Sequence, residues 1–132
     1  MRGRTLAVAA LLLLASACSG RADRDVQEAA FRHLFGVQAQ RDPADGPRVL
    51  RIDDAVPDDT FLARFEGEVP PITAAPGDAR GTAFWLTNLQ FGRGDRATLR
   101  GGYATATGAT REFDLALTRQ GGRWVVTAAS RR

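Results

Sequence analysis

The sequence predicts a single α+β domain, in which an N-terminal helix packs on a curved antiparallel β-meander, with a short second helix. Three observations support this fold class. Apolar residues recur at helical spacing over residues 25–40, four runs of about ten residues with β character begin at residue 82, and turn signals separate those runs. The chain has 132 residues, the length of one small domain.

Residues 1–17 have the pattern of a signal peptide. Arg2 and Arg4 supply positive charge, an uninterrupted apolar run covers residues 6–15, and small residues follow it. The run is shorter than the roughly 20 residues that cross a membrane. We therefore expect residues 1–17 to be removed on export.

Cys18, the only cysteine of the chain, directly follows Ala15, Ser16 and Ala17. This string is similar to the lipobox of bacterial lipoproteins, although Ala15 stands where leucine is usual. The resemblance implies acylation of Cys18, a polar tether over residues 18–24 and a membrane anchor in the cell envelope, and several acyl chains anchor a protein stably. The other interpretation is an ordinary cleavage site that releases a soluble periplasmic or secreted protein.

The predicted first helix covers residues 25–40. Asp25 and Glu28 form a capping-box pattern at its start, and it ends before Pro43. Its apolar face carries Val26, Ala30, Phe31, Leu34, Phe35 and Val37.

A short strand is predicted over residues 48–53, and an aspartate cap at 58–59 starts a short second helix that closes at Gly67. Residues 68–81 contain three prolines and two glycines, so we expect an irregular loop there. The four final strands are separated by turn signals at 92–94, 107–109 and 120–122.

Two details of the strands carry expectations. Gly101 and Gly102 fall in the middle of a strand and predict a bulge or a bend. The strand that contains Trp85 is apolar on both faces, so we expect the helix to cover one face and a loop or partner to cover the other.

Local strings in 59–72 (Phe-Leu followed by Pro-Pro), 101–103 (Gly-Gly-Tyr) and 122–126 (Gly-x-Trp-Val-Val) resemble a family of small, uncharacterised bacterial secreted proteins and lipoproteins. A helix followed by a bent antiparallel sheet is also similar to the cystatin-like and nuclear-transport-factor-2-like group. The resemblance implies an α+β fold and an exported location, and it brings no activity and no catalytic residue.

Five residues are candidates for a ligand or partner surface. Pro70 and Pro71 lie in the loop, where extended proline-rich backbone loses little entropy on binding. Trp85, Tyr103 and Trp124 could line the mouth of a cone-shaped sheet, as tyrosine and carboxylates do in nuclear-transport-factor-2-like enzymes. The alternative for these three residues is ordinary packing in the sheet, and for the loop it is packing over the sheet.

The remaining candidates favour structural roles. His33 could act as a general base, but a lone histidine at the edge of a helix face is more often structural. Asp114 could join Tyr103 at the mouth of the sheet cone as an acid or base, but in its alternating strand it is expected to face water. The aspartates in 53–59 lack the spacing of a calcium loop, and 93–95 (Arg-Gly-Asp) fits a hairpin turn better than a recognition tripeptide.

Charge and residue counts limit the possible partners and cofactors. All 18 basic residues are arginines, and without residues 1–17 the remaining 16 face 15 acidic residues. A net charge of +1 supports no nucleic-acid partner. One cysteine and one histidine exclude disulfides within the chain and sites that need several of either residue, so we expect no metal and no cofactor.

The sequence thus predicts a non-catalytic, lipid-anchored domain of the cell envelope that binds a protein or a small apolar ligand. Two alternatives remain open: a small nuclear-transport-factor-2-like enzyme with its site in the sheet cone, and a lipoprotein inhibitor that inserts the loop of residues 68–81 into a hydrolase.

Overall fold

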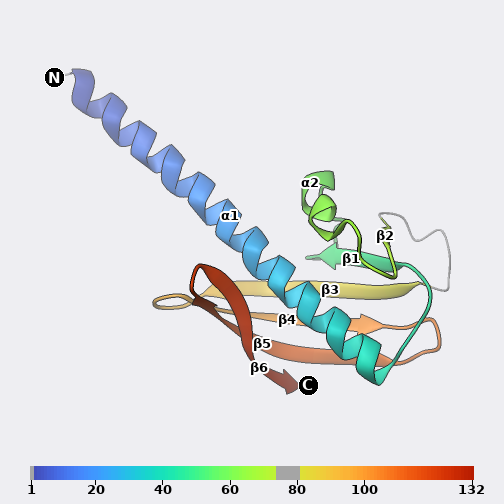
Figure 1. Cartoon of the computed structure of the whole chain (residues 1–132). Helices are drawn as coiled ribbons and strands as arrows, with labels where there is room; N and C mark the ends of the chain where they lie inside the picture. The colour runs from blue at the N-terminus through green and yellow to red at the C-terminus, as the bar shows by residue number, and fades with distance from the viewer. Residues whose placement is uncertain (1, 74–80) are drawn as a thin grey trace.

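The computed structural model describes the backbone of residues 2–73 and 81–132 and the side chains of residues 20–73 and 81–132. In this part of the chain one long helix crosses one face of a six-stranded sheet, so the α+β class is confirmed (Figure 1). The elements in chain order are α1 (Arg2–Arg41), β1 (Arg48–Ile52), α2 (Asp59–Leu62), the 3₁₀ turn η1 (Ala63–Phe65), β2 (Ile72–Thr73), β3 (Thr82–Phe91), β4 (Arg96–Ala104), β5 (Thr110–Gln120) and β6 (Arg123–Arg131).

Helix α1 is longer than predicted. It runs unbroken from Arg2 to Arg41, so residues 18–24 are helical and the prediction that the helix begins at Asp25 is wrong. Alanine, leucine and arginine dominate the preceding residues, and no proline interrupts them, so nothing stops the helix there. The Asp25 carboxylate accepts a hydrogen bond from Arg64 (2.8 Å) instead of capping a helix N-terminus. The N-terminal part of α1 extends past the sheet (Figure 1).

The C-terminal half of α1 buries the predicted apolar face. Phe35 meets Phe84 of β3 edge-on, with 4.8 Å between ring centroids. Phe31 contacts the rings of Phe61 and Phe65 at 6.1 Å each. Edge-on aromatic pairs add to the stabilisation from apolar burial. The core therefore lies between α1, the α2–η1 segment and the central strands.

The short second helix is confirmed. Asp58 precedes α2, and its carboxylate accepts a hydrogen bond from the backbone N–H of Phe61 (2.8 Å). This cap satisfies one of the free amides at the start of the helix. The segment turns away at Gly67, whose φ of 85° suits glycine.

The sheet order is β2-β1-β3-β4-β5-β6. The predicted four-stranded antiparallel meander is confirmed as β3 to β6. β1 is also confirmed as a strand, and it pairs in parallel with β3, a placement that the sequence did not predict. The prediction that residues 68–81 contain no regular structure is wrong, because β2 pairs in parallel with β1. The carbonyl of Pro71 accepts a hydrogen bond from the N–H of Arg48 (2.8 Å) and leads the chain into this pairing.

Gly101 and Gly102 form no bulge or register shift. The pairing of β4 with β5 is regular through both residues, and the irregularities fall between Thr87 and Gln90 and between Ala116 and Leu117. The lack of space for a side chain explains why both positions are glycine. A Cβ on Gly101 would lie 2.8 Å from Leu86, and one on Gly102 would lie 2.8 Å from the Trp85 ring and 2.2 Å from a backbone carbonyl of β5.

Candidate functional site

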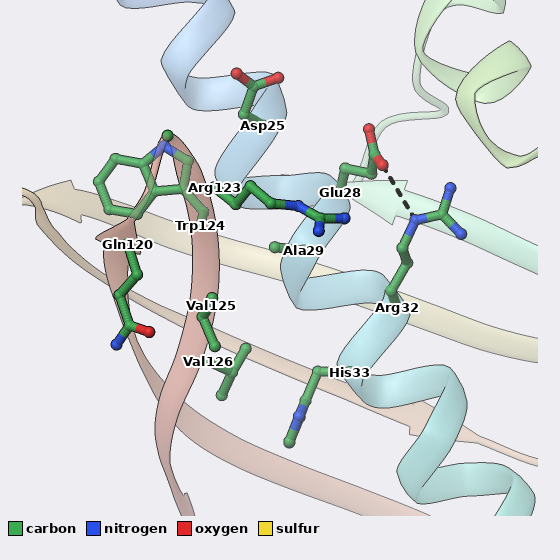
Figure 2. Close-up of a pocket in the computed structure, with 11 residues that line it drawn as sticks. Asp25, Glu28, Ala29, Arg32, His33, Gln120, Arg123, Trp124, Val125 and Val126 are labelled. Carbon is green, nitrogen blue, oxygen red and sulfur yellow. Dashed lines mark hydrogen bonds and ion pairs between the residues drawn. The ribbon is translucent and has the colours of Figure 1, made fainter.

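An open groove of about 670 Å³ lies between α1 and β6 (Figure 2). This volume falls in the range of small-ligand sites. The helix and the strand diverge here, because α1 crosses the sheet obliquely and extends past it (Figure 1). The lining residues are Asp25, Glu28, Ala29, Arg32 and His33 from α1, Gln120 from the end of β5, Gly122 from the β5–β6 turn, and Arg123, Trp124, Val125 and Val126 from β6.

The apolar wall of the groove is built by Ala29, Trp124 and Val126, which are partly buried and pack against the core. The ring of Phe91 packs edge-on against the ring of Trp124, with 5.9 Å between the centroids. The tight turn before β6 has positive φ at both Gly121 and Gly122 (58° and 79°), as a two-residue hairpin requires. The sequence thus fixes Trp124 two residues from a rigid turn, on the side of the sheet that faces α1.

Charged residues line the helix side of the groove. Arg32 donates to Glu28 (3.1 Å), to Glu68 (2.5 Å) and to the carbonyl of Arg64 (2.9 Å). Arg64 donates in turn to Asp25 and Glu28. These bonds tie α1 to the α2–η1 segment and neutralise the two carboxylates of the groove. Arg123 points from β6 across the groove towards α1 (Figure 2) and forms no ion pair within the described part of the chain.

His33 lies in this groove and is half-buried. Burial lowers the pKa of its imidazole, because a charged ring would lose solvation there. Burial thus favours the neutral ring, which can both donate and accept one hydrogen bond. The expectation that His33 sits at the edge of the apolar face of the helix is confirmed.

Tyr103 lies in the core and not in the groove. It is fully buried, and its hydroxyl donates to the Asp42 carboxylate (2.5 Å), which also accepts from Arg111 Nε (2.5 Å). Hydrogen bonds from Arg111 and Tyr103 lower the pKa of Asp42 to about 2, and burial together with the hydrogen bond to Asp42 raises the pKa of Tyr103 to about 12. The triad joins the end of α1 to β4 and β5, and the structure gives Tyr103 the packing role named as its alternative.

The other predicted surface residues are spread over the molecule. Trp85 is half-buried on the face of the sheet opposite to α1, over Gly102, so it lies on the other face from Trp124. Pro70 is half-buried after a cis peptide bond, and Pro71 is exposed beside β1. The three aromatic residues therefore do not form one mouth, and most of the loop that follows Pro71, residues 74–80, lies outside the described residues.

The minor candidates have structural surroundings. Asp114 is exposed, as expected, and lies 3.5 Å from Arg100 and 3.6 Å from Arg132. The Arg-Gly-Asp string forms the predicted turn between β3 and β4, with a φ of 66° at Gly94. Within residues 20–73 and 81–132, no cluster of three or more potential ligands could hold a metal ion.

No family model, curated protein or solved structure matches this chain. Among the described residues, none of the helices is both long and apolar enough to span a membrane. Cys18 lies in the part of α1 whose side chains are outside the described residues.

Sequence reasoning singled out His33 and Trp124 but missed the groove that joins them. Ala29, Arg32 and Val126 gave no separate signal, because each fits an ordinary helix or strand pattern. Only the angle between α1 and β6 brings these residues together.

Proposed function

We propose that this protein is an exported, lipid-anchored domain of the cell envelope that binds a polypeptide or a small apolar ligand in the groove between α1 and β6, without chemical change to the ligand. The groove carries the proposal. It combines an apolar wall (Ala29, Trp124 and Val126) with charged groups on its rim, the arrangement by which proteins bury part of a ligand and orient the rest.

Packing of the helix side of the sheet favours binding over catalysis in a sheet cone. Phe35, Phe84 and Tyr103 fill the space between α1 and the central strands, and each is at most 4% exposed. A site in the cone, as in a nuclear-transport-factor-2-like enzyme, would need that space for its substrate. We retain the cystatin-like and nuclear-transport-factor-2-like relationship, and membership of the uncharacterised lipoprotein family, as proposals based on the helix, the meander and the local strings.

The anchor proposal depends on the small-residue string before Cys18. Asp25, the first groove residue, follows Cys18 by seven residues. At 1.5 Å per helical residue the groove would begin about 10 Å from the acylated cysteine. A ligand in the groove would therefore be held close to the membrane surface.

Cys18→Ala tests the anchor. We expect the wild-type chain to fractionate with membranes and to incorporate labelled palmitate, and its leader cleavage to stop with globomycin. The Cys18→Ala variant should lose the label and the sensitivity to globomycin. Unchanged fractionation and processing would contradict lipidation and favour the ordinary cleavage site.

Occupancy of the groove can be measured by maleimide labelling, because acylation leaves the chain without a free thiol. The variants are Ala29→Cys, inside the groove, and Ala39→Cys, exposed on the same helix away from it. A ligand that fills nine-tenths of the grooves would slow labelling of Ala29→Cys about tenfold in cell envelopes relative to purified protein. The Ala39→Cys rate should not change. Equal ratios for both variants would contradict a groove that is occupied in the cell.

A further inference from the structure

Among the residues that the structure describes, strand β6 forms one edge of the sheet and pairs only with β5. An edge strand offers a row of backbone donors and acceptors to an added strand. The groove lies directly beside this edge, since it is lined by four consecutive residues of β6, 123–126.

The backbone groups that face outwards can be identified. In an antiparallel pair, hydrogen-bonded and non-hydrogen-bonded residue pairs alternate. The N–H of Arg119 donates to the carbonyl of Asp95 (2.8 Å), on the side of β5 away from β6. The pair Arg119–Trp124 is therefore non-hydrogen-bonded, as is Leu117–Val126 two residues on, after which the register shifts by one residue between Leu117 and Ala116. The N–H and C=O groups of Trp124 and the N–H of Val126, which precede this shift, consequently point to the open edge.

The side chains of Trp124 and Val126 line the groove. An added strand would pair with the outward backbone groups of Trp124 and Val126. Its residues directly opposite these two would place their side chains on the same face of the sheet as Trp124 and Val126. Alternate side chains of an added strand would therefore lie on the groove face beside Trp124. The edge and the groove form one continuous surface.

Charge selects the occupant of this surface. Arg123 and Arg131 stand at the two ends of β6, both exposed and without an ion pair to any described residue, and Arg132 follows. Antiparallel pairing with the β6 of a second copy would bring Arg123 of one chain close to Arg131 and Arg132 of the other at both ends. Facing like charges oppose such pairing, whereas carboxylates at these positions would favour it.

We propose that β6 binds an extended peptide segment of a partner protein, with acidic residues at both ends and apolar residues at alternate positions between them. The inference rests on the proposed function and specifies its ligand. The peptide adds a seventh strand to the sheet, directs its apolar side chains into the groove and sets its carboxylates against Arg123 and Arg131.

The test is residue-resolved amide hydrogen exchange of the full chain in lipid nanodiscs. The probe is a blocked ten-residue peptide with two aspartates at each end and alternating valine and threonine between them, and the control carries lysines in place of the aspartates. The outward amides of Trp124 and Val126 should exchange fast without peptide and slow at least tenfold with the aspartate peptide only. The inward amides of Arg123 and Val125 should be protected in both states.

Two sets of variants separate backbone pairing from charge. Val126→Pro removes an outward N–H without breaking the pairing with β5, and Val126→Ala is its control for the lost side chain. We expect the proline variant to bind the aspartate peptide about tenfold more weakly than the alanine variant. Arg123→Glu combined with Arg131→Glu should reverse the preference, so that the lysine peptide binds instead.

Three results would overturn the inference: no protection of the Trp124 and Val126 amides at about 1 mM peptide, equal protection by the lysine peptide, or protection that rises with protein concentration alone. The last result would indicate pairing between two copies. Slowed labelling of Ala29→Cys in envelopes, combined with any of these results, would leave the proposed function standing and refute only the acidic extended peptide as its ligand.

Discussion

The Tyr103→Phe substitution tests how the end of α1 is fixed to the sheet. The Tyr103 hydroxyl is buried and donates to the Asp42 carboxylate at 2.5 Å, while Arg111 holds the same carboxylate from β5. Phenylalanine keeps the ring and its contact with Phe84 (5.7 Å between centroids) and removes only the hydroxyl. The substitution therefore isolates one hydrogen bond.

The expected loss follows from the kind of bond that is removed. A hydrogen bond to a charged group contributes about 1.5–3 kcal/mol to the free energy of unfolding. Burial and the hydrogen bond to Asp42 raise the pKa of Tyr103 from its ordinary 10.0 to about 12, so the hydroxyl keeps its proton at neutral pH. We therefore expect Tyr103→Phe to unfold with a free energy about 1.5–3 kcal/mol lower at neutral pH. Because the folded pKa is raised, the wild type keeps this contribution below pH 10 and loses it as the pH rises towards 12.

Two assays measure this effect. Denaturant unfolding gives the loss for Tyr103→Phe, and a cycle with Asp42→Asn gives the coupling between the two side chains. Tyr103 is the only tyrosine of the chain, so tyrosinate absorbance follows this residue alone. The folded protein should titrate near pH 12 and the unfolded chain near pH 10. A folded midpoint near 10, or a loss below about 0.5 kcal/mol, would refute the buried hydrogen bond.

Three further predictions concern stability. Gly102→Ala should lower the free energy of unfolding by about 1–3 kcal/mol, because the added Cβ would clash with a backbone carbonyl of β5. Gly36→Ala has open space around the added Cβ and should raise the free energy of unfolding by about 0.5–1 kcal/mol, measured by denaturant unfolding. Asp58→Ala should lower the free energy of unfolding by about 1 kcal/mol through the lost cap, and an unchanged midpoint would contradict that role. Because the pKa of Asp42 is lowered to about 2, its contribution should be lost between about pH 4 and pH 2, and Asp42→Asn should not show this loss in acid titrations.

Local sequence signals predicted most of the secondary structure. The Asp58 cap, the alternation Phe113–Leu115–Leu117 and the two glycines before Arg123 act within a few residues, so their outcomes could be predicted without the tertiary fold. The capping pattern at Asp25 gave a wrong helix start because it, too, is a signal from only a few residues. A cap requires the preceding residues to leave the helix, and the alanine- and leucine-rich stretch before it continues the helix instead.

The features that depend on distant residues could not be predicted. Asp42 and Tyr103 are 61 residues apart, and nothing local indicates that the end of α1 reaches β4. The groove has the same origin. His33 and Trp124 were recognisable as candidates, but their position on either side of one groove depends on how α1 crosses the sheet.

We propose that the groove between α1 and β6 holds a ligand in the cell envelope. Photo-crosslinking in living cells tests it most directly, with benzoylphenylalanine in place of Ala29 in the groove or in place of Ala39 on the exposed side of α1. Mass spectrometry of the purified protein then identifies any adduct, polypeptide or small molecule. We expect a single dominant adduct from position 29 and none from position 39. No adduct from position 29, or the same adducts from both positions, would contradict the claim.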